Sequence, residues 1–336
     1  MSLADQSRDE LGAQFELYRR ELRAHCYRML GAIQDAEDMV QETFLRAWRR
    51  RDTLETTSSL KSWLYAIATN ICLDTLKRRP RRVAPVMLGA ASTLAEPIPE
   101  KTFEPMWMEP YPDSLLLASP DPTPEDLLIE REQVALAFIV VLQLLPPRQR
   151  AVLLLRDVLD WPASEVAAFL DTTVPAVKSA LHRARELIAA RKLDHAAQLL
   201  NLNGEFDGAA QQLSAYVNAW EAGDGAALAQ LLKEDATFSM PPIPAWYHGK
   251  ESIHALVLST VFDGDAYGRW RLLPTAANGQ PAFGLYRQDE TSGYYQAYGI
   301  QVVTFSGQLV SDITTFMDAG LLRHFKLPNA LPPACG

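Results

Sequence analysis

Residues 162–190 read PASEVAAFLDTTVPAVKSALHRARELIAA and contain two helical patterns joined by a turn. Val166, Ala167 and Leu170 recur at the spacing of one buried helix face. The turn Asp171–Thr173 supplies hydroxyl groups that can cap the following helix, Val174–Ala190. A short helix, a tight turn and a second helix are the parts of a helix-turn-helix motif, so this stretch predicts a DNA-binding fold.

The second helix of this motif has a basic, hydrogen-bonding face. Its apolar side chains fall on one side of the helix, and the opposite side is polar. The predicted reading face consists of Lys178, Ser179, His182, Arg183 and Arg185. Arginine and lysine pair well with guanine edges in the major groove, whereas serine is permissive. At this point the alternative is a small helical bundle whose basic face is only solvated.

The sequence DAEDMVQETFLRAWRR, residues 35–50, predicts an amphipathic helix with an acidic and amide-bearing outer face. Its apolar stripe is Ala36, Val40, Phe44, Ala47 and Trp48. Asp38, Gln41 and Glu42 fall on the opposite side at spacings of three and four residues, so they are presented together. From this pattern alone, a face that merely contacts water is the usual explanation.

A further helix is predicted over residues 60–79, followed by a basic stretch. The polar and aromatic side chains off its apolar stripe include Lys61, Tyr65, Asn70, Arg78 and Arg79. Aromatic, amide and cationic groups together suit melted DNA, where bases stack and phosphates pair with cations. Cations at the end of a helix also stabilise its dipole, which is a purely structural alternative.

These segments resemble two regions of the extracytoplasmic-function (ECF) sigma factors of RNA polymerase. Most of residues 11–82 resemble region 2, and residues 145–192 resemble region 4. The resemblance implies that the acidic and amide face docks on the β′ clamp helices of core polymerase, and that the β flap is a second contact. It also implies that the loop Asp52–Ser59 and the next helix contact the minus-10 element, and that the reading face contacts the minus-35 element. Ala180 stands where many members have arginine, which leaves the promoter sequence open.

The formal net charge of −9 hides an uneven distribution along the chain. Residues 1–85 hold 15 basic and 12 acidic side chains, and residues 131–195 hold 9 and 7. The acidic excess lies in residues 86–130 and 196–336. Because phosphate contacts need local positive charge, the total does not exclude DNA as a partner. Ten prolines from Pro80 to Pro124 rule out a long helix there and predict an extended linker.

Residues from about 205 to 328 resemble SnoaL-like domains, the cone-shaped α+β fold shared with nuclear transport factor 2 and ketosteroid isomerase. The resemblance implies two helices, Gln211–Ala222 and Ala226–Leu232, packed over a curved sheet that begins at Thr237–Met240. The side chains expected near the mouth of such a cone are Asp235, Trp246, Tyr247, His248, Arg271, Tyr286, Asp312 and Asp318. A catalytic role, small-ligand sensing and a regulatory docking role stay open as alternatives for this domain.

The sequence thus predicts a multidomain chain with two all-α sigma domains and an α+β cone-shaped domain. The expected divisions are region 2 over 1–82, a linker over 83–124, region 4 over 125–195 and the SnoaL-like domain over 205–330. We expect a cytoplasmic transcription initiation factor with no catalytic residues, no metal site and no cofactor, whose partners are core RNA polymerase and promoter DNA but no membrane. A small ligand or an intramolecular contact at the last domain is an additional expectation. The rival hypotheses are an enzyme with a helical appendage and a DNA binder without polymerase contact, which would have no use for the acidic face.

Overall fold

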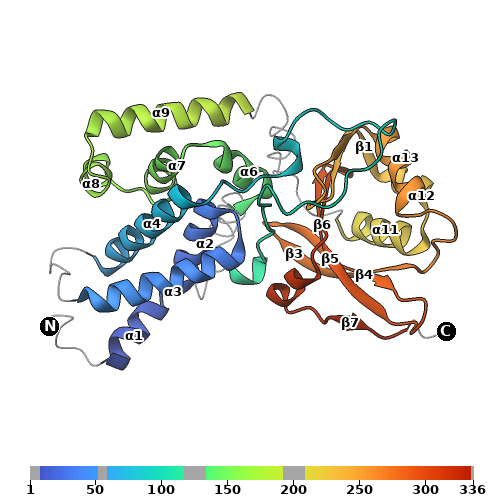
Figure 1. Ribbon diagram of the computed structural model, residues 1–336, viewed down its shortest axis with the longest axis horizontal. Coiled ribbons are helices and arrows are strands. Elements are labelled where there is room, and N and C mark those ends of the chain that lie inside the picture. The colour runs from blue at the N-terminus through green and yellow to red at the C-terminus, as the bar shows by residue number, and fades with distance from the viewer. Residues whose placement is uncertain (1–7, 52–58, 117–133, 192–208, 334–336) are drawn as a thin grey trace. The chain divides into compact units, whose positions relative to one another are not determined.

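The structure, a computed structural model, describes residues 8–51, 59–116, 134–191 and 209–333. The chain divides into two compact units. The first unit combines residues 1–82 with 115–196, and the second combines residues 83–114 with 197–336. Figure 1 shows that the first unit is built from helices and that the second contains the sheet.

The helices of the first unit follow the predicted patterns closely. They are α1 (Arg8–Glu16), α2 (Arg19–Leu30), α3 (Ile33–Arg49), α4 (Leu60–Arg78), α6 (Leu136–Leu144), α7 (Pro147–Leu153), α8 (Ala163–Phe169) and α9 (Val174–Arg191). Gly31 ends α2 in the left-handed conformation, with φ of 76°. The Ser59 hydroxyl begins α4 by accepting a hydrogen bond of 3.1 Å from the Ser62 amide.

The first four helices share a core that the apolar stripes predicted only in part. Ala36, Val40 and Ala47 of α3 are fully buried, as expected. Phe44 and Trp48 are only half-buried, and the ring of Phe44 stacks on Phe15 of α1 at 5.7 Å. The prediction that these two aromatic side chains lie in the core was therefore wrong: Phe44 packs at the edge of the core against Phe15, and Trp48 lies under the guanidinium of Arg51 at 4.8 Å.

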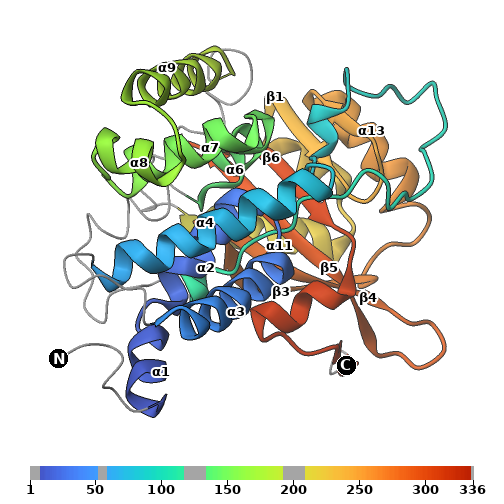
Figure 2. The ribbon, with the colours of Figure 1, turned by 60° about the vertical axis from the view of Figure 1, so that its left-hand side comes forward.

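The helix-turn-helix motif is present at the predicted residues (Figure 2). Val166, Ala167 and Leu170 of the first helix and its following turn are buried. Asp171 has a φ of 48° in the turn, and the Thr173 hydroxyl accepts a hydrogen bond from the Ala176 amide at 3.3 Å. The capping prediction for this turn is confirmed. Val177, Leu181 and Ala184 of α9 are buried as predicted, whereas Ile188 is only half-buried.

Within the first unit, α6 and α7 pack against the N-terminal helices around a buried arginine. The Arg150 side chain is 1% exposed and donates hydrogen bonds to the Met29 carbonyl at the end of α2 and to Gln143 Oε1 at 2.6 Å. It also donates to the carbonyls of Gln143 and Leu145, each at 3.2 Å. Gln143 Nε2 donates to the Arg28 carbonyl at 3.3 Å. In the structure α6 begins at Leu136, and residues 117–133 lie outside the described residues.

The second unit is an α+β domain with a mainly antiparallel sheet. Its elements are α11 (Ala209–Ala222), α12 (Gly225–Leu231), β1 (Leu232–Ser239), β2 (Trp246–His248), α13 (Lys250–Thr260), β3 (Trp270–Ala277), β4 (Gln280–Gln288), β5 (Tyr295–Ser306), β6 (Leu309–Phe316), the 3-10 helix Ala319–Phe325 and β7 (Ala330–Leu331). The strand order is β2-β1-β6-β5-β4-β3, with β7 paired to β5. Only the β1–β6 pair is parallel among the described strands.

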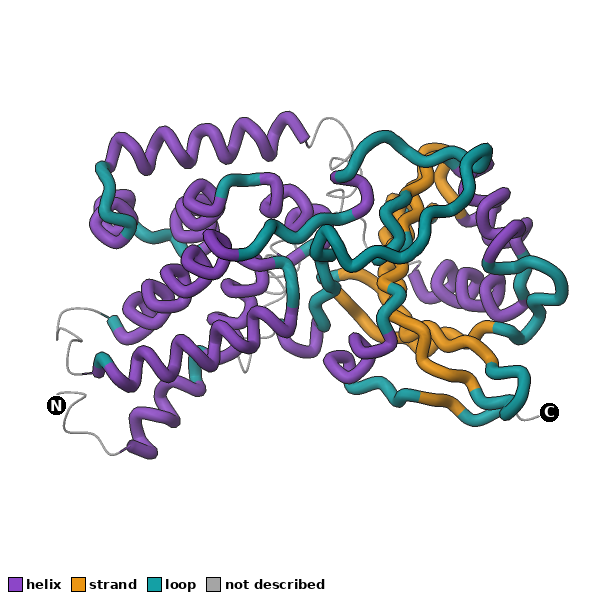
Figure 3. The backbone as a smooth tube through the Cα atoms, in the orientation of Figure 1, coloured by secondary structure: helices purple, strands orange, loops and turns teal. Residues whose placement is uncertain are grey.

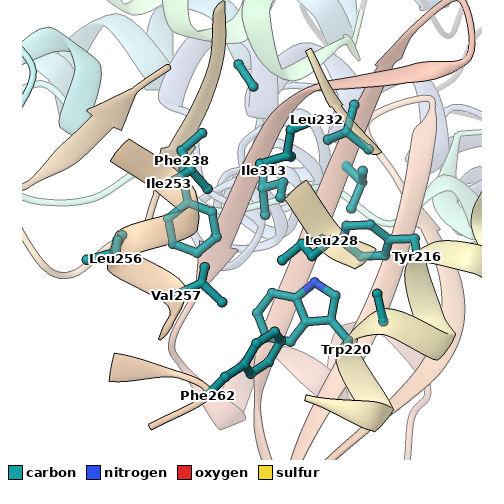
Figure 4. Close-up of a cluster of buried hydrophobic side chains, with 14 of the residues drawn as sticks. Tyr216, Trp220, Leu228, Leu232, Phe238, Ile253, Leu256, Val257, Phe262 and Ile313 are labelled. Atoms are coloured by element: carbon teal, nitrogen blue, oxygen red, sulfur yellow. The ribbon is translucent and has the colours of Figure 1, made fainter. Parts of the chain in front are cut away.

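The core of this unit lies between the sheet and its helices. Figure 4 shows Trp220 of α11 beside Phe262, with Val257 of α13 and Ile313 of β6 nearby. Trp220 and Phe262 meet edge to face, with ring centroids 5.3 Å apart. Both faces of β6 are buried apart from its first residue, although polar and apolar residues partly alternate along it. The sheet begins at Leu232, five residues before the predicted start at Thr237.

Residues 83–114, which we call the strap, run as an extended chain within the second unit (Figure 3). Ser92 donates from its amide to the Trp246 carbonyl at 2.7 Å, and Thr102 donates to the Pro242 carbonyl at 3.0 Å. Near its end, the Tyr111 amide donates to Asn278 Oδ1 at 2.8 Å. The proline-rich composition thus gave an extended backbone, as predicted. These hydrogen bonds hold the strap against the α+β domain, which composition alone does not reveal.

Candidate functional site

The outer face of α3 presents the predicted acidic and amide groups. Asp38 and Gln41 are exposed, and Glu42 is half-buried next to Arg46, which pairs with it at 2.6 Å. Leu45, one turn further along, has 52% of its surface exposed. The face therefore presents carboxylates, an amide and one exposed apolar side chain together.

Two of the residues predicted to contact minus-10 DNA meet at Glu21 of α2. Lys61 is exposed and its ammonium lies 2.6 Å from Glu21 Oε2. Tyr65 is only 2% exposed, and its hydroxyl donates to the same carboxylate oxygen at 3.1 Å. Burial raises the pKa of Tyr65 well above its usual value. Tyr65 is a core residue in this structure, because α2 covers a second side of α4 that the apolar stripe did not include, so a base cannot stack on it.

The other predicted minus-10 residues lie on the surface of α4. Asn70 and Arg78 are exposed. Arg79 is exposed but pairs with Asp35 at 3.1 Å, and Arg82 pairs with the same carboxylate at 2.8 Å. Arg79 therefore also ties the end of α4 to the start of α3. The loop predicted to capture a base falls outside the described residues except for Ser59.

The predicted reading face on α9 is exposed, but one of its residues, Arg185, points toward another part of the helical unit. Lys178, Ser179, His182 and Arg183 are all exposed, and Arg183 Nη1 donates to Ser179 Oγ at 2.7 Å. Arg185 instead forms two hydrogen bonds to Asp157, at 2.9 and 2.7 Å, and this contact raises its pKa. Arg185 thus supports the packing of α9 on the helical turn that follows α7. The other four side chains stay exposed, and His182 Nε2 lies 3.3 Å from Glu186 Oε1 on the same helix.

The second unit contains a pocket of about 180 Å³. Trp220, Phe238, Trp270 and Tyr298 form aromatic walls, and Ile98 of the strap contributes to the lining. None of the side chains predicted from sequence for the mouth of a cone lines this pocket. The sequence reasoning missed its residues because β-bulges in β4 and β5 shift the alternation that would have assigned faces.

The most perturbed carboxyl group of this unit lies away from the pocket lining. Asp312 is 7% exposed and accepts hydrogen bonds from the hydroxyls of Thr237 and Thr314. Burial raises its pKa to about 6, although both hydroxyls act in the opposite direction. Tyr286 donates to the Pro328 carbonyl, and Asp318 caps the following 3-10 helix. His248 is exposed and precedes Gly249, whose φ is 91°, so it has the predicted surface position in a turn.

Three family models match the chain. The model described as Sigma-70 region 2 matches residues 14–82, Sigma-70 region 4 matches residues 135–188, and SnoaL-like domain matches residues 213–313. In the described parts of the chain, no helix is long and apolar enough to span a bilayer, and no cluster of three metal-binding side chains is found.

Several known proteins are similar to the chain. A Mycobacterium tuberculosis protein named ECF RNA polymerase sigma factor SigG is 41% identical over 334 residues, which cover 98% of this chain and 86% of that protein. The Bacillus subtilis protein named ECF RNA polymerase sigma factor SigW is 28% identical over 52% of this chain and 83% of its own length. The crystal structure of the M. tuberculosis extracytoplasmic function sigma factor SigJ has the same fold, with a TM-score of 0.62, 23% identity, and coverage of 94% of this chain and 99% of that chain.

Proposed function

Because the chain belongs to the ECF sigma factors of RNA polymerase, we propose specific roles for the surfaces of α3 and α9. The chain binds core RNA polymerase and directs transcription initiation at promoters. We also propose that, as a sigma factor, it does not act as an enzyme. The observation that carries the residue assignment is the presence of two exposed surfaces of opposite chemistry, one acidic on α3 and one basic on α9.

In this proposal, Asp38, Gln41 and Glu42 contact core polymerase. Their carboxylates accept charge-assisted hydrogen bonds from a basic partner surface, and the exposed Leu45 adds an apolar contact. Lys61, Asn70, Arg78 and Arg79 lie on or next to α4 and are assigned to minus-10 DNA. Lys61 pairs with Glu21 and Arg79 pairs with Asp35 in the structure. A contact of either side chain with DNA would replace its ion pair or form beside it.

On α9 we assign Lys178, Ser179, His182 and Arg183 to minus-35 DNA and give Arg185 a supporting role. Lys178, Ser179 and His182 lie in the N-terminal half of the helix, the part of a recognition helix that reaches base edges, and Arg183 lies at its midpoint. The Arg185 guanidinium is already occupied by a bidentate pair with Asp157. The two arginines, two residues apart on the same helix, therefore make a matched pair for an experiment.

Replacing Arg183 by alanine should reduce promoter binding and run-off transcription roughly 5-fold to 150-fold, because a direct contact to a base edge is lost. The loss should depend on the base at one minus-35 position. The matched variant Arg185→Ala should keep that base preference, since it removes a contact inside the helical unit. Filter binding and run-off assays with core polymerase on a set of minus-35 substitutions measure both effects. An unchanged base preference in Arg183→Ala would remove this residue from the reading face.

We also propose that the α+β domain modulates the sigma regions without catalysing a reaction. The described residues that line its pocket include no aspartate, glutamate or histidine, so general acid–base chemistry has no obvious group to use there. The strap connects the end of region 2 to the chain that leads into region 4, and the domain holds it by hydrogen bonds at Trp246, Pro242 and Asn278. A strap held in this way restricts how far the two DNA-binding regions can separate.

A chain that ends at Asn203 should therefore give more transcript from a matched promoter than the full chain, at equal concentration of polymerase. Release of the strap lengthens the free connection between regions 2 and 4, so the two can reach their separate elements more readily. Run-off transcription with purified core polymerase measures the ratio. The variant Asn278→Ala in the full chain removes the side-chain bond to Tyr111 and should change transcription in the same direction by a smaller factor. Lower transcription from both versions would mean that the domain assists the sigma regions.

A further inference from the structure

The pocket of the α+β domain is large enough for one six-membered ring, and its walls are mainly aromatic side chains. Its volume is about 180 Å³, and its walls include the faces or edges of Trp220, Phe238, Trp270 and Tyr298. An apolar protein cavity of about 150 Å³ is large enough to bind benzene. The pocket therefore accommodates a single aromatic or alicyclic ring with a short substituent.

Most polar groups at the pocket are already committed to the protein. The guanidinium of Arg269 donates to the side chain of Asp263 at 2.7 Å and to the carbonyls of Asp263 and Asp265 at 2.7 and 2.9 Å. The indole N–H of Trp270 donates to the Val261 carbonyl at 3.1 Å. These side chains hold the wall in place and have little capacity left for a ligand.

Tyr298 and Arg287 retain capacity for a ligand. Among the described residues, the Tyr298 hydroxyl donates to the thioether of Met317, at 3.4 Å, which is a weak acceptor. Arg287 is exposed, lines the pocket and lies over the ring of Trp270 at 5.9 Å. Within the described residues, Arg287 has no ion pair with a carboxylate. A second cation, Lys101 of the strap, lies 5.8 Å from the centre of the Tyr298 ring.

These observations define the charge as well as the shape of the occupant. Among the described residues neither Arg287 nor Lys101 has a carboxylate partner, so both cations can pair with an anionic group of a ligand. An arginine fork matches the geometry of a carboxylate, and a phenol hydroxyl can donate to the same group. We propose that this pocket binds a small ring-bearing carboxylic acid, with the ring among the aromatic walls and the carboxylate at Arg287 and Tyr298.

The strap forms one wall of the proposed site through Ile98. The hydrogen bonds at Ser92 and Thr102 hold the strap on either side of Ile98. A ligand in the pocket would therefore touch the segment that follows region 2. The binding site itself is independent of the sigma function, whereas any effect of the ligand on the strap rests on the proposed modulatory role of the domain.

The proposal can be tested with phenylacetate and its neutral isostere phenylacetamide as probes for the full chain. Binding is followed by isothermal titration and by quenching of tryptophan fluorescence, to which Trp220 and Trp270 contribute. We expect phenylacetate to bind at least 10-fold more tightly than phenylacetamide. The variant Arg287→Gln should weaken phenylacetate binding at least 10-fold and leave phenylacetamide binding unchanged. Ile98→Ala should weaken both probes by a similar factor, because it removes part of the apolar wall and no charge.

The matched control is Arg271→Gln. Arg271 lies on β3, which pairs with β4, the strand that carries Arg287. Like Arg287, it lies over an aromatic ring, in this case that of Tyr295, at 5.6 Å. It does not line the pocket, so this variant should bind both probes as the unmodified chain does. Absence of phenylacetate binding at 10 mM would overturn the proposal. Equal affinities for acid and amide, or equal losses in Arg271→Gln and Arg287→Gln, would overturn the assignment of the carboxylate to Arg287.

Discussion

Replacing Asp38 and Glu42 together by arginine should lower the affinity of the chain for core RNA polymerase by at least 100-fold. The two substitutions change the charge of the α3 outer face by four units and turn attraction for a basic partner surface into repulsion. Transcription should fall with core binding, because initiation requires the sigma factor bound to core polymerase. Fluorescence anisotropy of the labelled chain, titrated with core polymerase, measures the affinity directly.

The fold should tolerate this double substitution. Asp38 is exposed, and the pair that Glu42 makes with Arg46 is partly exposed, so its loss costs little. Circular dichroism should therefore show unchanged helix content. The charge-matched control is Glu251→Arg with Glu290→Arg, two exposed carboxylates of the α+β domain, and it should bind polymerase normally. Equal affinity of the double variant and the unmodified chain would show that polymerase docks on another face.

The sequence predicted the helices well because each has a strong local signal. The recognition helix is an example: Val177, Leu181 and Ala184 recur at helical spacing, and Thr173 provides the cap. The same reasoning failed at Tyr65, which the apolar stripe left outside. A stripe describes packing against one neighbour, whereas α4 packs against α2 and α3, and the hydroxyl of Tyr65 is satisfied by Glu21.

The pocket and the attachment of the strap could not be predicted from sequence in the same way. Both depend on contacts between residues far apart in the chain, such as the amide of Tyr111 and the side chain of Asn278. Proline content predicts that the strap is extended but contains no information about which surface receives it. In the sheet, the bulge between Leu285 and Tyr286 changes which side chains share a face, so the pocket residue Leu285 could not be assigned by counting alternate positions.

The packing of region 4 on region 2 in this structure must open when both promoter elements are bound. The minus-10 and minus-35 elements lie about 25 base pairs apart, which is roughly 85 Å of DNA. Arg150 of α7 nevertheless donates a hydrogen bond to the carbonyl of Met29 in α2, and Gln143 donates to the carbonyl of Arg28. Contacts of this length cannot persist when the two regions occupy separate elements. The structure therefore represents a closed arrangement of the two regions.

Arg150 both destabilises and stabilises the closed arrangement, through the burial of its charge and through its hydrogen bonds. Burial lowers its pKa to about 9, and within the described residues no carboxylate pairs with it. The buried cation disfavours the closed state, but its guanidinium is also the donor for three carbonyls that water cannot easily reach. Removal of the side chain leaves those carbonyls without a donor only in the closed state, since opening exposes them to water. The loss of hydrogen bonds should therefore outweigh the relief of the buried charge.

The variant Arg150→Met should accordingly shift the chain toward the open arrangement by roughly 10-fold to 150-fold, the equivalent of one lost hydrogen bond from a charged donor. Dyes attached at Asn70→Cys of region 2 and Glu186→Cys of region 4 report the separation by energy transfer, in a background in which Cys335 is serine. Cys26 and Cys72 are buried and should not react. Gln143→Leu, which removes the weaker bond to Arg28, should produce a smaller shift. Unchanged energy transfer with native helix content would mean that apolar packing between the two regions, and not Arg150, holds them together.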